Sequence, residues 1–246
     1  MPLRIPPPNS DITVAILAGG MGTRLRPVVS DRPKVLASVG NRPFLAWWLD
    51  ALDAQGFRDV VLCTGYRAAQ VEEAFGKSVG NLRLRYSVED TPLGTGGAIH
   101  KALPLVRSST VLVLNGDSFC HQDLRPFVMQ HFERACRASL LVTSVPDVGR
   151  YGCVQLGADG QVKRFQEKSG QSGQGWINAG IYLLSRDLFS VLPAHMSISL
   201  ERDLLPRWLS QEIHAFPSSG RFIDIGTPDS LSVATEFFLG QPLAAA

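Results

Sequence analysis

A glycine-rich stretch at residues 17–25, LAGGMGTRL, constrains the fold of this chain more than any other segment. It follows an apolar, partly β-branched run at residues 13–17 that predicts a buried strand. Its three glycines let the main chain approach a ligand, so that backbone N–H groups can bind phosphate oxygens. Two cations accompany the loop, Arg24 within it and Lys34 directly after Pro33. The stretch therefore predicts a phosphate-binding loop after a strand.

Two common phosphate-binding loops do not fit this stretch. The dinucleotide fingerprint requires Gly-x-Gly-x-x-Gly, whereas Gly20 and Gly22 are followed by Leu25 at the third glycine position. It also requires an acid near the end of the second strand, where this chain has CTGY at residues 63–66. A Walker loop ends in Gly-Lys-Ser or Gly-Lys-Thr, which this loop lacks. The remaining alternative is a tight turn with two solvated cations.

Composition limits the class of protein. The 246 residues are 45% hydrophobic and 19% charged, which is typical of a globular protein. The 24 basic and 22 acidic residues are interleaved, so we expect a small-molecule partner and no nucleic acid. No apolar run reaches the roughly 18 residues of a membrane span, and the start lacks the core of a signal peptide, which predicts a cytoplasmic protein. The four cysteines form no Cys-x-x-Cys pair and indicate buried reduced thiols, not zinc ligands.

Hydrophobic periodicity predicts an α/β fold, a Rossmann-like three-layer sandwich with a mostly parallel mixed sheet. Strands expected at residues 13–17, 60–63, 82–87 and 111–114 alternate with helices expected at residues 44–52, 71–75 and 124–135. Short strands between glycine turns at residues 151–156 and 160–165 predict a small antiparallel hairpin insertion. We expect an irregular tail over residues 1–10 and a single domain over residues 11–240.

Two further segments end at the same edge of the predicted sheet. Residues 89–99 form a second glycine-rich loop that leads into a helix, with an ordinary turn as the alternative. The strand at residues 111–114 delivers Asn115 and Asp117, and a carboxylate there could bind Mg²⁺ beside a nucleoside triphosphate. Loops at the carboxyl ends of strands face one crevice. His131 borders the apolar face of its helix and is expected to be a partly buried polar residue, not a catalyst.

Taken together, these motifs resemble the sugar-phosphate nucleotidylyltransferases over about residues 13–239. The family signature Gly-Gly-x-Gly-Thr-Arg-Leu followed by Pro-Lys stands at residues 19–25 and 33–34. Later family motifs follow in order at residues 93–97, 115–117, 151–152, 167–168, 178–180 and 224–228. Within the family, the chain looks most like the D-glycero-α-D-manno-heptose 1-phosphate guanylyltransferase branch. Mannose 1-phosphate guanylyltransferases and small sugar uridylyltransferases share much of the pattern and stay alternatives.

The resemblance implies a fold of the nucleotide-diphospho-sugar transferase type and a Mg²⁺-dependent enzyme of nucleotide-sugar biosynthesis. Such an enzyme transfers a nucleoside monophosphate from a nucleoside triphosphate to a sugar 1-phosphate and releases pyrophosphate. The implied catalytic residues are Arg24, Lys34 and Asp117, with Asp117 and Asp224 as ligands of Mg²⁺. The implied nucleotide-binding residues are Leu17, Ala18, Gly19, Gly20, Gly22, Thr23, Arg24, Lys34, Glu89, Gly94, Thr95 and Asn115. The implied sugar-phosphate-binding residues are Gly152, Glu167, Lys168 and Asn178.

Base preference depends on Glu89, which lies just ahead of the second loop. An ionised carboxylate can accept two hydrogen bonds from guanine N1–H and N2–H₂, which uracil and thymine cannot supply. We therefore expect GTP, with an exposed-loop Glu89 as the alternative.

Three other possibilities stay open at this point. A glycosyltransferase of related fold would be expected to carry an Asp-x-Asp motif, which the sequence lacks. A nucleotide-sugar sensor without activity would have been free to lose Lys34, Asp117 or Asp224. A homodimer could form through the hairpin and through exposed aromatic residues such as Trp176.

Overall fold

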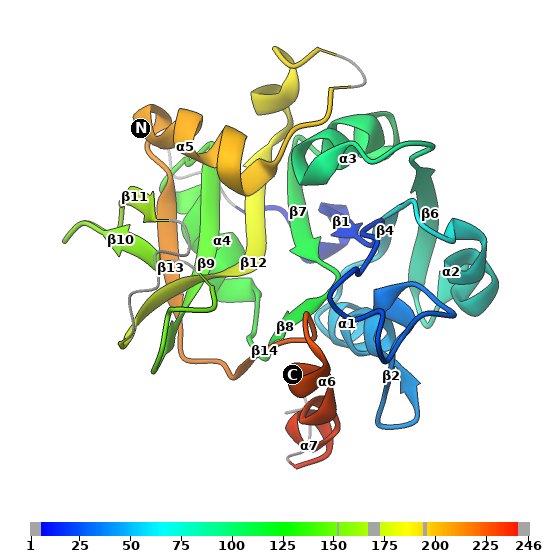
Figure 1. The fold of residues 1–246 in the computed structure, drawn as a ribbon. Coiled ribbons are helices and arrows are strands. Elements are labelled where there is room, and N and C mark those ends of the chain that lie inside the picture. The colour runs from blue at the N-terminus through cyan, green and yellow to red at the C-terminus, as the bar shows by residue number, and fades with distance from the viewer. Residues whose placement is uncertain (1–5, 152, 167–172, 194–195, 241–246) are drawn as a thin grey trace.

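A computed structural model describes residues 6–151, 153–166, 173–193 and 196–240 (Figure 1). An eight-stranded sheet organises the chain, with strand order β13-β9-β12-β7-β1-β4-β6-β5. Its strands are β1 (Thr13–Leu17), β4 (Asp59–Thr64), β5 (Ser78–Val79), β6 (Leu82–Val88), β7 (Thr110–Asn115), β9 (Ala138–Val145), β12 (Gly175–Ser185) and β13 (His214–Ser218). The pairs β7-β1, β1-β4, β4-β6 and β9-β13 are parallel, whereas β12 runs antiparallel to both of its neighbours. The predicted mostly parallel mixed sheet is therefore confirmed.

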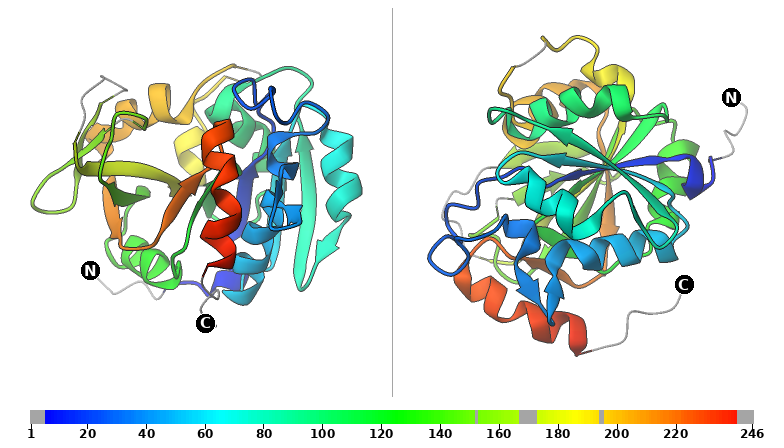
Figure 2. Two further views of the ribbon diagram at one scale, coloured as in Figure 1. Left: turned by 60° about the horizontal axis from the view of Figure 1, so that its bottom comes forward. Right: turned by 90° about the vertical axis from the view of Figure 1, so that its right-hand side faces the viewer.

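Helices cover both faces of this sheet, as the right-hand view of Figure 2 shows. The helices are α1 (Phe44–Ala54), α2 (Ala68–Phe75), α3 (Gly94–Ala102), α4 (Arg125–Glu133), α5 (Leu205–Trp208), α6 (Pro228–Ser232) and α7 (Ala234–Leu239). Buried side chains of α1, α2, α4 and α7 pack in one core, and those of α3 and α5 pack in another. Alternate residues of β1 point into the two cores, Val14 and Ile16 into the first and Ala15 into the second. This arrangement confirms the three-layer sandwich.

Short elements complete the chain. Single helical turns are η1 (Asn9–Asp11), η2 (Lys34–Leu36), η3 (Leu103–Leu105), η4 (Arg186–Phe189) and η6 (Leu209–Gln211), and η5 (Leu200–Leu204) is a π-helical turn. Three two-stranded antiparallel sheets pair β2 (Ser38–Val39) with β3 (Arg42–Pro43), β8 (Ser118–Cys120) with β14 (Phe222–Asp224), and β10 (Cys153–Leu156) with β11 (Val162–Gln166). The β10-β11 pair is the predicted hairpin.

Helix α1 illustrates how local sequence sets the element boundaries. Its large apolar residues, Phe44 and Trp48 among them, recur at helical spacing and are buried. The helix ends at Ala54, and Gly56 follows with a φ of +84°, a left-handed conformation that favours glycine. The indole N–H of Trp48 donates to the carbonyl of Ser118 at 2.6 Å. This bond fixes the short strand β8, directly after Asp117, against the helix layer.

Several details differ from the sequence expectations. Trp176 is partly buried and packs against the second core, so the prediction that it is exposed is wrong. Trp176 therefore no longer supports a homodimer. Residues 9–11 form the turn η1 within the tail that was expected to be irregular. All four cysteines are free, but Cys136 and Cys153 are only partly buried. No helix in the described part of the chain has the length and apolarity needed to span a membrane.

Candidate active site

The carboxyl ends of β1, β4 and β7 lie side by side. Leu17, the last residue of β1, pairs in register with Cys63 on one side and with Asn115 on the other. The main chain packs closely here, because a Cβ at Gly116 would lie 2.5 Å from the carbonyl oxygen of Leu17. The glycine-rich loop leaves β1 at this point, and Asp117 follows β7 at the same edge. Parallel pairing thus brings the two predicted motifs together.

The glycines of the loop at residues 17–25 serve different purposes. Gly22 has a φ of +58° and contacts the Lys34 side chain, so the turn itself requires glycine there. At Gly19, a Cβ would lie 2.5 Å from Oε1 of Glu89. Gly20 faces open space, since a Cβ at this residue would have no neighbouring atom within 4 Å. Within the described chain, the backbone amides of residues 19–23 donate no hydrogen bond, and they are available to an anion.

A small cavity of about 180 Å³ adjoins this loop. It is lined by eight of the predicted residues, namely Leu17, Ala18, Gly20, Gly22, Thr23, Arg24, Lys34 and Asp117. Arg24 also lines a neighbouring cavity of about 680 Å³, together with Asn115, Asn178 and Asp224. The structure therefore brings most of the predicted nucleotide and metal residues to one region that also contains a predicted sugar residue.

Lys34 is the most buried charged group of the small cavity. Its side chain is 10% exposed, and Nζ lies 2.8 Å from Oδ2 of Asp117. Pro33 precedes the turn η2 with a φ of −60° and so sets the direction from which Lys34 enters the site. A Cβ at Gly226 would lie 3.4 Å from Nζ of Lys34 and 2.4 Å from Oδ1 of Asp224. The ammonium group thus lies beside both predicted metal-binding carboxylates.

The pairing of β8 with β14 brings Asp117 and Asp224 together. Asp224 pairs with Ser118, and the amide of Ile225 donates to the carbonyl of Asp117 at 2.9 Å. Burial raises the pKa of Asp224, the negative charge of Asp117 raises it further, and Lys34 opposes the rise. The Asp224 carboxylate accepts a hydrogen bond from the Gly226 amide at 2.6 Å. Two like charges are therefore held near each other in a partly desolvated site.

This pair of carboxylates fits a Mg²⁺ ion. Among the described residues, no group of three His, Cys, Asp or Glu side chains could enclose a metal ion. Mg²⁺ often binds one or two carboxylates and completes its coordination with water and substrate phosphates. A divalent cation would also offset the repulsion that raises the pKa of Asp224. The donor set matches an ion that arrives with a nucleotide.

Asn178 owes its position to a bulge in β12. The register between β12 and β9 shifts between Asn178 and Tyr182, and Gly180 within this bulge has a φ of +73°. Oδ1 of Asn178 accepts from the Gly180 amide at 2.9 Å. A Cβ at Gly180 would lie within 2.9 Å of three Asn115 atoms, so glycine allows β7 and β12 to present both asparagines to the larger cavity. Oδ1 of Asn115 is buried without a partner among the described residues.

Glu89 lies between the two glycine-rich loops. Its side chain packs against Gly19 and Gly65, and a Cβ at Gly65 would lie 2.9 Å from Cγ of Glu89. Oε2 accepts a hydrogen bond from the Leu93 amide at 3.0 Å. Burial raises the pKa of Glu89, while this hydrogen bond and Lys101 lower it. Glu89 is half-buried beside the phosphate-binding loop, which argues against the exposed-loop alternative.

The second loop contacts another part of the chain and lines neither of these cavities. Gly94 packs against the backbone of Ile198, and Oγ1 of Thr95 donates to Glu201 at 2.6 Å. Glu201 itself lines the larger cavity together with Arg150 and Arg202, and sequence reasoning missed all three. Ser199 caps the turn that carries Glu201, since its hydroxyl accepts a hydrogen bond from the Arg202 amide. Gly152, Glu167 and Lys168, predicted to bind the sugar phosphate, lie outside the described residues.

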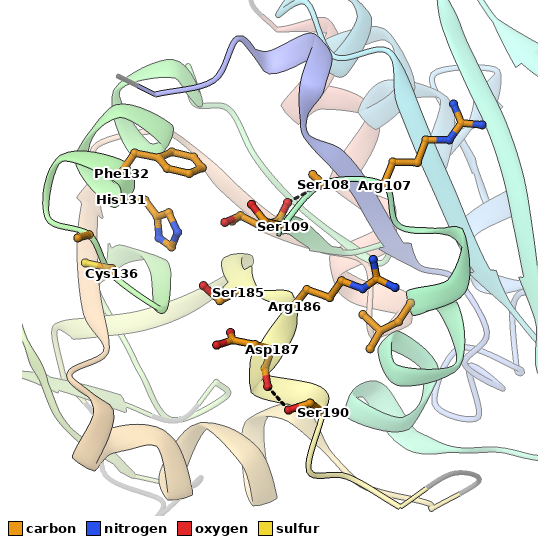
Figure 3. A pocket seen from close by; sticks show the side chains of 13 residues that line it. Arg107, Ser108, Ser109, His131, Phe132, Cys136, Ser185, Arg186, Asp187 and Ser190 are labelled. Atoms are coloured by element: carbon orange, nitrogen blue, oxygen red, sulfur yellow. Dashed lines mark hydrogen bonds between the residues drawn. The ribbon is translucent and has the colours of Figure 1, made fainter. Parts of the chain in front are cut away.

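A further cavity of about 800 Å³ lies at the opposite edge of the sheet, near the start of β7 and the end of β12 (Figure 3). His131 lines it, is 3% exposed, and places Nδ1 2.9 Å from the Ser139 hydroxyl. Burial lowers the pKa of His131 to about 4. This histidine lies away from the two cavities described above, and it is fully buried, not partly buried as the sequence predicted.

The chain is similar to known proteins over most of its length. The family described as nucleotidyl transferase matches residues 13–241. The D-glycero-alpha-D-manno-heptose 1-phosphate guanylyltransferase of Aneurinibacillus thermoaerophilus is 38% identical over 87% of this chain and 93% of its own. The mannose-1-phosphate guanylyltransferase of Mycobacterium tuberculosis is 32% identical over 89% of this chain and 62% of its own. The crystal structure of HddC from Yersinia pseudotuberculosis complexed with GMP-PN is 35% identical with a TM-score of 0.83, and the match covers 92% of this chain and 99% of that chain.

Proposed function

Because this chain belongs to the nucleotidyl transferase family, we propose that it transfers a nucleoside monophosphate from GTP to a sugar 1-phosphate, D-glycero-α-D-manno-heptose 1-phosphate. The products are a GDP-sugar and pyrophosphate. The observation that carries this proposal is the cluster of Lys34, Asp117 and Asp224 beside a loop with unpaired amides. Such a cluster binds and polarises a polyphosphate, and the larger cavity beside it has room for a sugar.

The chemical step needs positioning and charge neutralisation more than proton transfer. A phosphate monoester has a second pKa near ~6, so the attacking oxygen of the sugar 1-phosphate is already largely ionised at neutral pH. In the proposed reaction this oxygen forms a bond to the α-phosphorus, and the bond to the departing pyrophosphate breaks in line. The amides of residues 19–23 bind the triphosphate, while Arg24 and Lys34 neutralise the pyrophosphate.

Asp117 and Asp224 would hold Mg²⁺ at the boundary between the two cavities. When bound, the ion supplies Lewis-acid stabilisation of the charge on the transferring phosphoryl group. Asn178 and Asn115 face the neighbouring cavity, where Asn178 would bond sugar hydroxyls and the unpaired Oδ1 of Asn115 would accept a donor from the nucleotide. Lys168, Glu167 and Gly152 would complete the sugar-phosphate site, as the family motifs imply.

Glu89 supports the choice of GTP. Its carboxylate lies beside Gly19, at the start of the phosphate-binding loop. Guanine offers this carboxylate two adjacent N–H donors that pyrimidines lack. Among the similar proteins, those from Aneurinibacillus thermoaerophilus and Mycobacterium tuberculosis are both named guanylyltransferases, for a heptose and for mannose respectively. Mannose 1-phosphate is therefore the second candidate acceptor.

A substrate matrix tests this proposal. Pyrophosphate release is measured with GTP, ATP, UTP and dTTP against heptose, mannose and glucose 1-phosphates in the presence of Mg²⁺. We expect GTP with the heptose 1-phosphate to give the highest kcat/KM. Equal or better use of UTP would mean that Glu89 does not select guanine. If no pair of substrates releases pyrophosphate, the transferase proposal is contradicted.

A further inference from the structure

A chain of hydrogen bonds connects the second glycine-rich loop with β12, and the mechanism above does not use it. The hydroxyl of Thr95, on α3, donates to Oε2 of Glu201 at 2.6 Å. The hydroxyl of Tyr182, on β12, donates to Oε1 of the same carboxylate at 3.1 Å. Nδ2 of Asn178 then donates to the Tyr182 oxygen at 2.8 Å. One carboxylate thus joins a predicted nucleotide residue to a predicted sugar residue.

All donors in this network point toward Glu201. Oγ1 of Thr95 accepts from the Leu200 amide at 2.8 Å and donates its own proton to the carboxylate. Oγ of Ser199 accepts from the Arg202 amide at 3.2 Å and likewise donates to Oε2 of Glu201 at 3.2 Å. An ionised carboxylate only accepts hydrogen bonds, so it can end three such donor chains at once. The network therefore has one consistent arrangement of its protons.

The second glycine-rich loop is shaped to receive the segment that carries Glu201. The amides of Gly96 and Gly97 both donate to the carbonyl of Ile198, at 2.9 and 3.2 Å. A Cβ at Gly94 would lie 2.6 Å from that same oxygen, and a Cβ at Gly96 would lie 2.7 Å from Cδ1 of Leu204. These glycines allow close packing of residues 198–204 on the start of α3. Residues 198–204, which include Glu201, are therefore in direct contact with this loop.

Burial makes the network energetically significant. Tyr182 is fully buried, and burial together with the charge of Glu201 raises its pKa well above the ordinary value, so its hydroxyl stays a donor. A buried donor or acceptor that loses its partner keeps its desolvation cost. Both ends of the Tyr182 link, Glu201 and Asn178, line the larger cavity. The π-helical turn η5 that carries Glu201 is a form of backbone common at functional sites.

We propose that Glu201 is a positioning residue that couples nucleotide binding at the second glycine-rich loop to sugar 1-phosphate binding at Asn178. This inference rests on the proposed function for the identity of the two ligands, and on Gly94 and Thr95 as the nucleotide-binding residues that the family motifs imply, since this loop lines neither cavity. A nucleotide that orders the loop also orders Glu201, Tyr182 and Asn178, so the sugar 1-phosphate binds to a site that is already arranged. The coupling is reciprocal, because the two binding equilibria are linked.

Tyr182→Phe tests the link at its centre, since Tyr182 is not itself among the residues that line either cavity of the site. We expect the KM for the heptose 1-phosphate to rise about tenfold, with the Kd for GTP and kcat each changed by less than about threefold. Tyr86→Phe is the matched control, because it removes a tyrosine hydroxyl bond to the Gly76 carbonyl on the far side of the sheet. Equal increases for both substrates, or no change in either, would overturn the proposal.

Hydrogen exchange provides a readout that does not require turnover. With GTP and Mg²⁺ but no sugar, the wild-type chain should gain amide protection at residues 17–25 and 93–97 and also at residues 178–182. In Glu201→Ala, the protection at the loops should persist and that at residues 178–182 should disappear. The coupling is contradicted if residues 178–182 gain no protection in the wild type. It is also contradicted if they keep this protection in Glu201→Ala. If no sugar 1-phosphate is turned over, the proposed function fails by itself, and this experiment still decides the coupling.

Discussion

At the scale of single residues, Glu89 is the side chain proposed to select GTP over the pyrimidine triphosphates. Glu89→Gln replaces one carboxylate oxygen by an amide that donates, which opposes the N–H groups of guanine. We expect kcat/KM for GTP to fall by about tenfold while that for UTP changes little. Steady-state kinetics with both triphosphates measure this, with Glu73→Gln on the exposed surface of α2 as the control. An equal loss for GTP and UTP would assign Glu89 a structural role.

Burial of His131 should make the stability of the folded chain depend on pH. Its pKa is about 4 in the folded chain, against an ordinary value of 6.5, because burial disfavours the charged ring. The unfolded chain therefore binds a proton between these values that the folded chain does not, and stability falls as the pH falls from about 6.5 to about 4. In urea titrations, the wild type should lose about 3 kcal/mol more than His131→Gln between pH 7 and pH 4. Parallel pH profiles for the two proteins would contradict this.

At the scale of elements, the bulge in β12 determines how two strands face the larger cavity. Gly180→Ala combines a φ of +73° with a Cβ within 2.9 Å of Asn115. We expect a loss of about 1–3 kcal/mol in unfolding free energy and a larger relative loss of kcat/KM. Gly56→Ala is the matched control, since Gly56 has a φ of +84° but its new Cβ would have no neighbouring atom within 4 Å. Activity that falls no further in Gly180→Ala than in the control would mean that the bulge does not position the asparagines.

Elements and their alignment were predictable where short-range patterns specify them. The loop at residues 17–25 follows the buried strand β1, with Lys34 later in the same connection, and Asp117 follows the buried strand β7. Parallel pairing brings the ends of these two strands together. Glu201 could not be predicted in this way, because its partner Thr95 lies 106 residues earlier and its π-helical turn has no clear sequence pattern. Trp176 was predicted wrongly, because the second core that it packs against is made of residues from distant parts of the chain, which the sequence around Trp176 does not indicate.

At the scale of the whole molecule, the sheet brings the two proposed substrate sites together. The loop at residues 17–25 follows β1 and Asp117 follows β7, whereas Asn178 lies on β12, on the other side of β7 from β1 (Figure 1). The antiparallel strand β12 lies directly beside β7, so the two proposed substrates meet along one strand pair. Asp117 and Asp224 lie near this boundary, where the proposed transfer takes place.

The most direct test of this account is product analysis by ³¹P NMR with GTP, the heptose 1-phosphate and Mg²⁺, for the wild type and Asp117→Asn. We predict that the wild type forms pyrophosphate and a GDP-sugar together in equal amounts. Asp117→Asn, with its fold confirmed by circular dichroism, should form both at least about a hundredfold more slowly, since it loses a carboxylate that holds the ion. Inorganic phosphate as the product of the wild type, or undiminished turnover in the folded variant, would contradict the account.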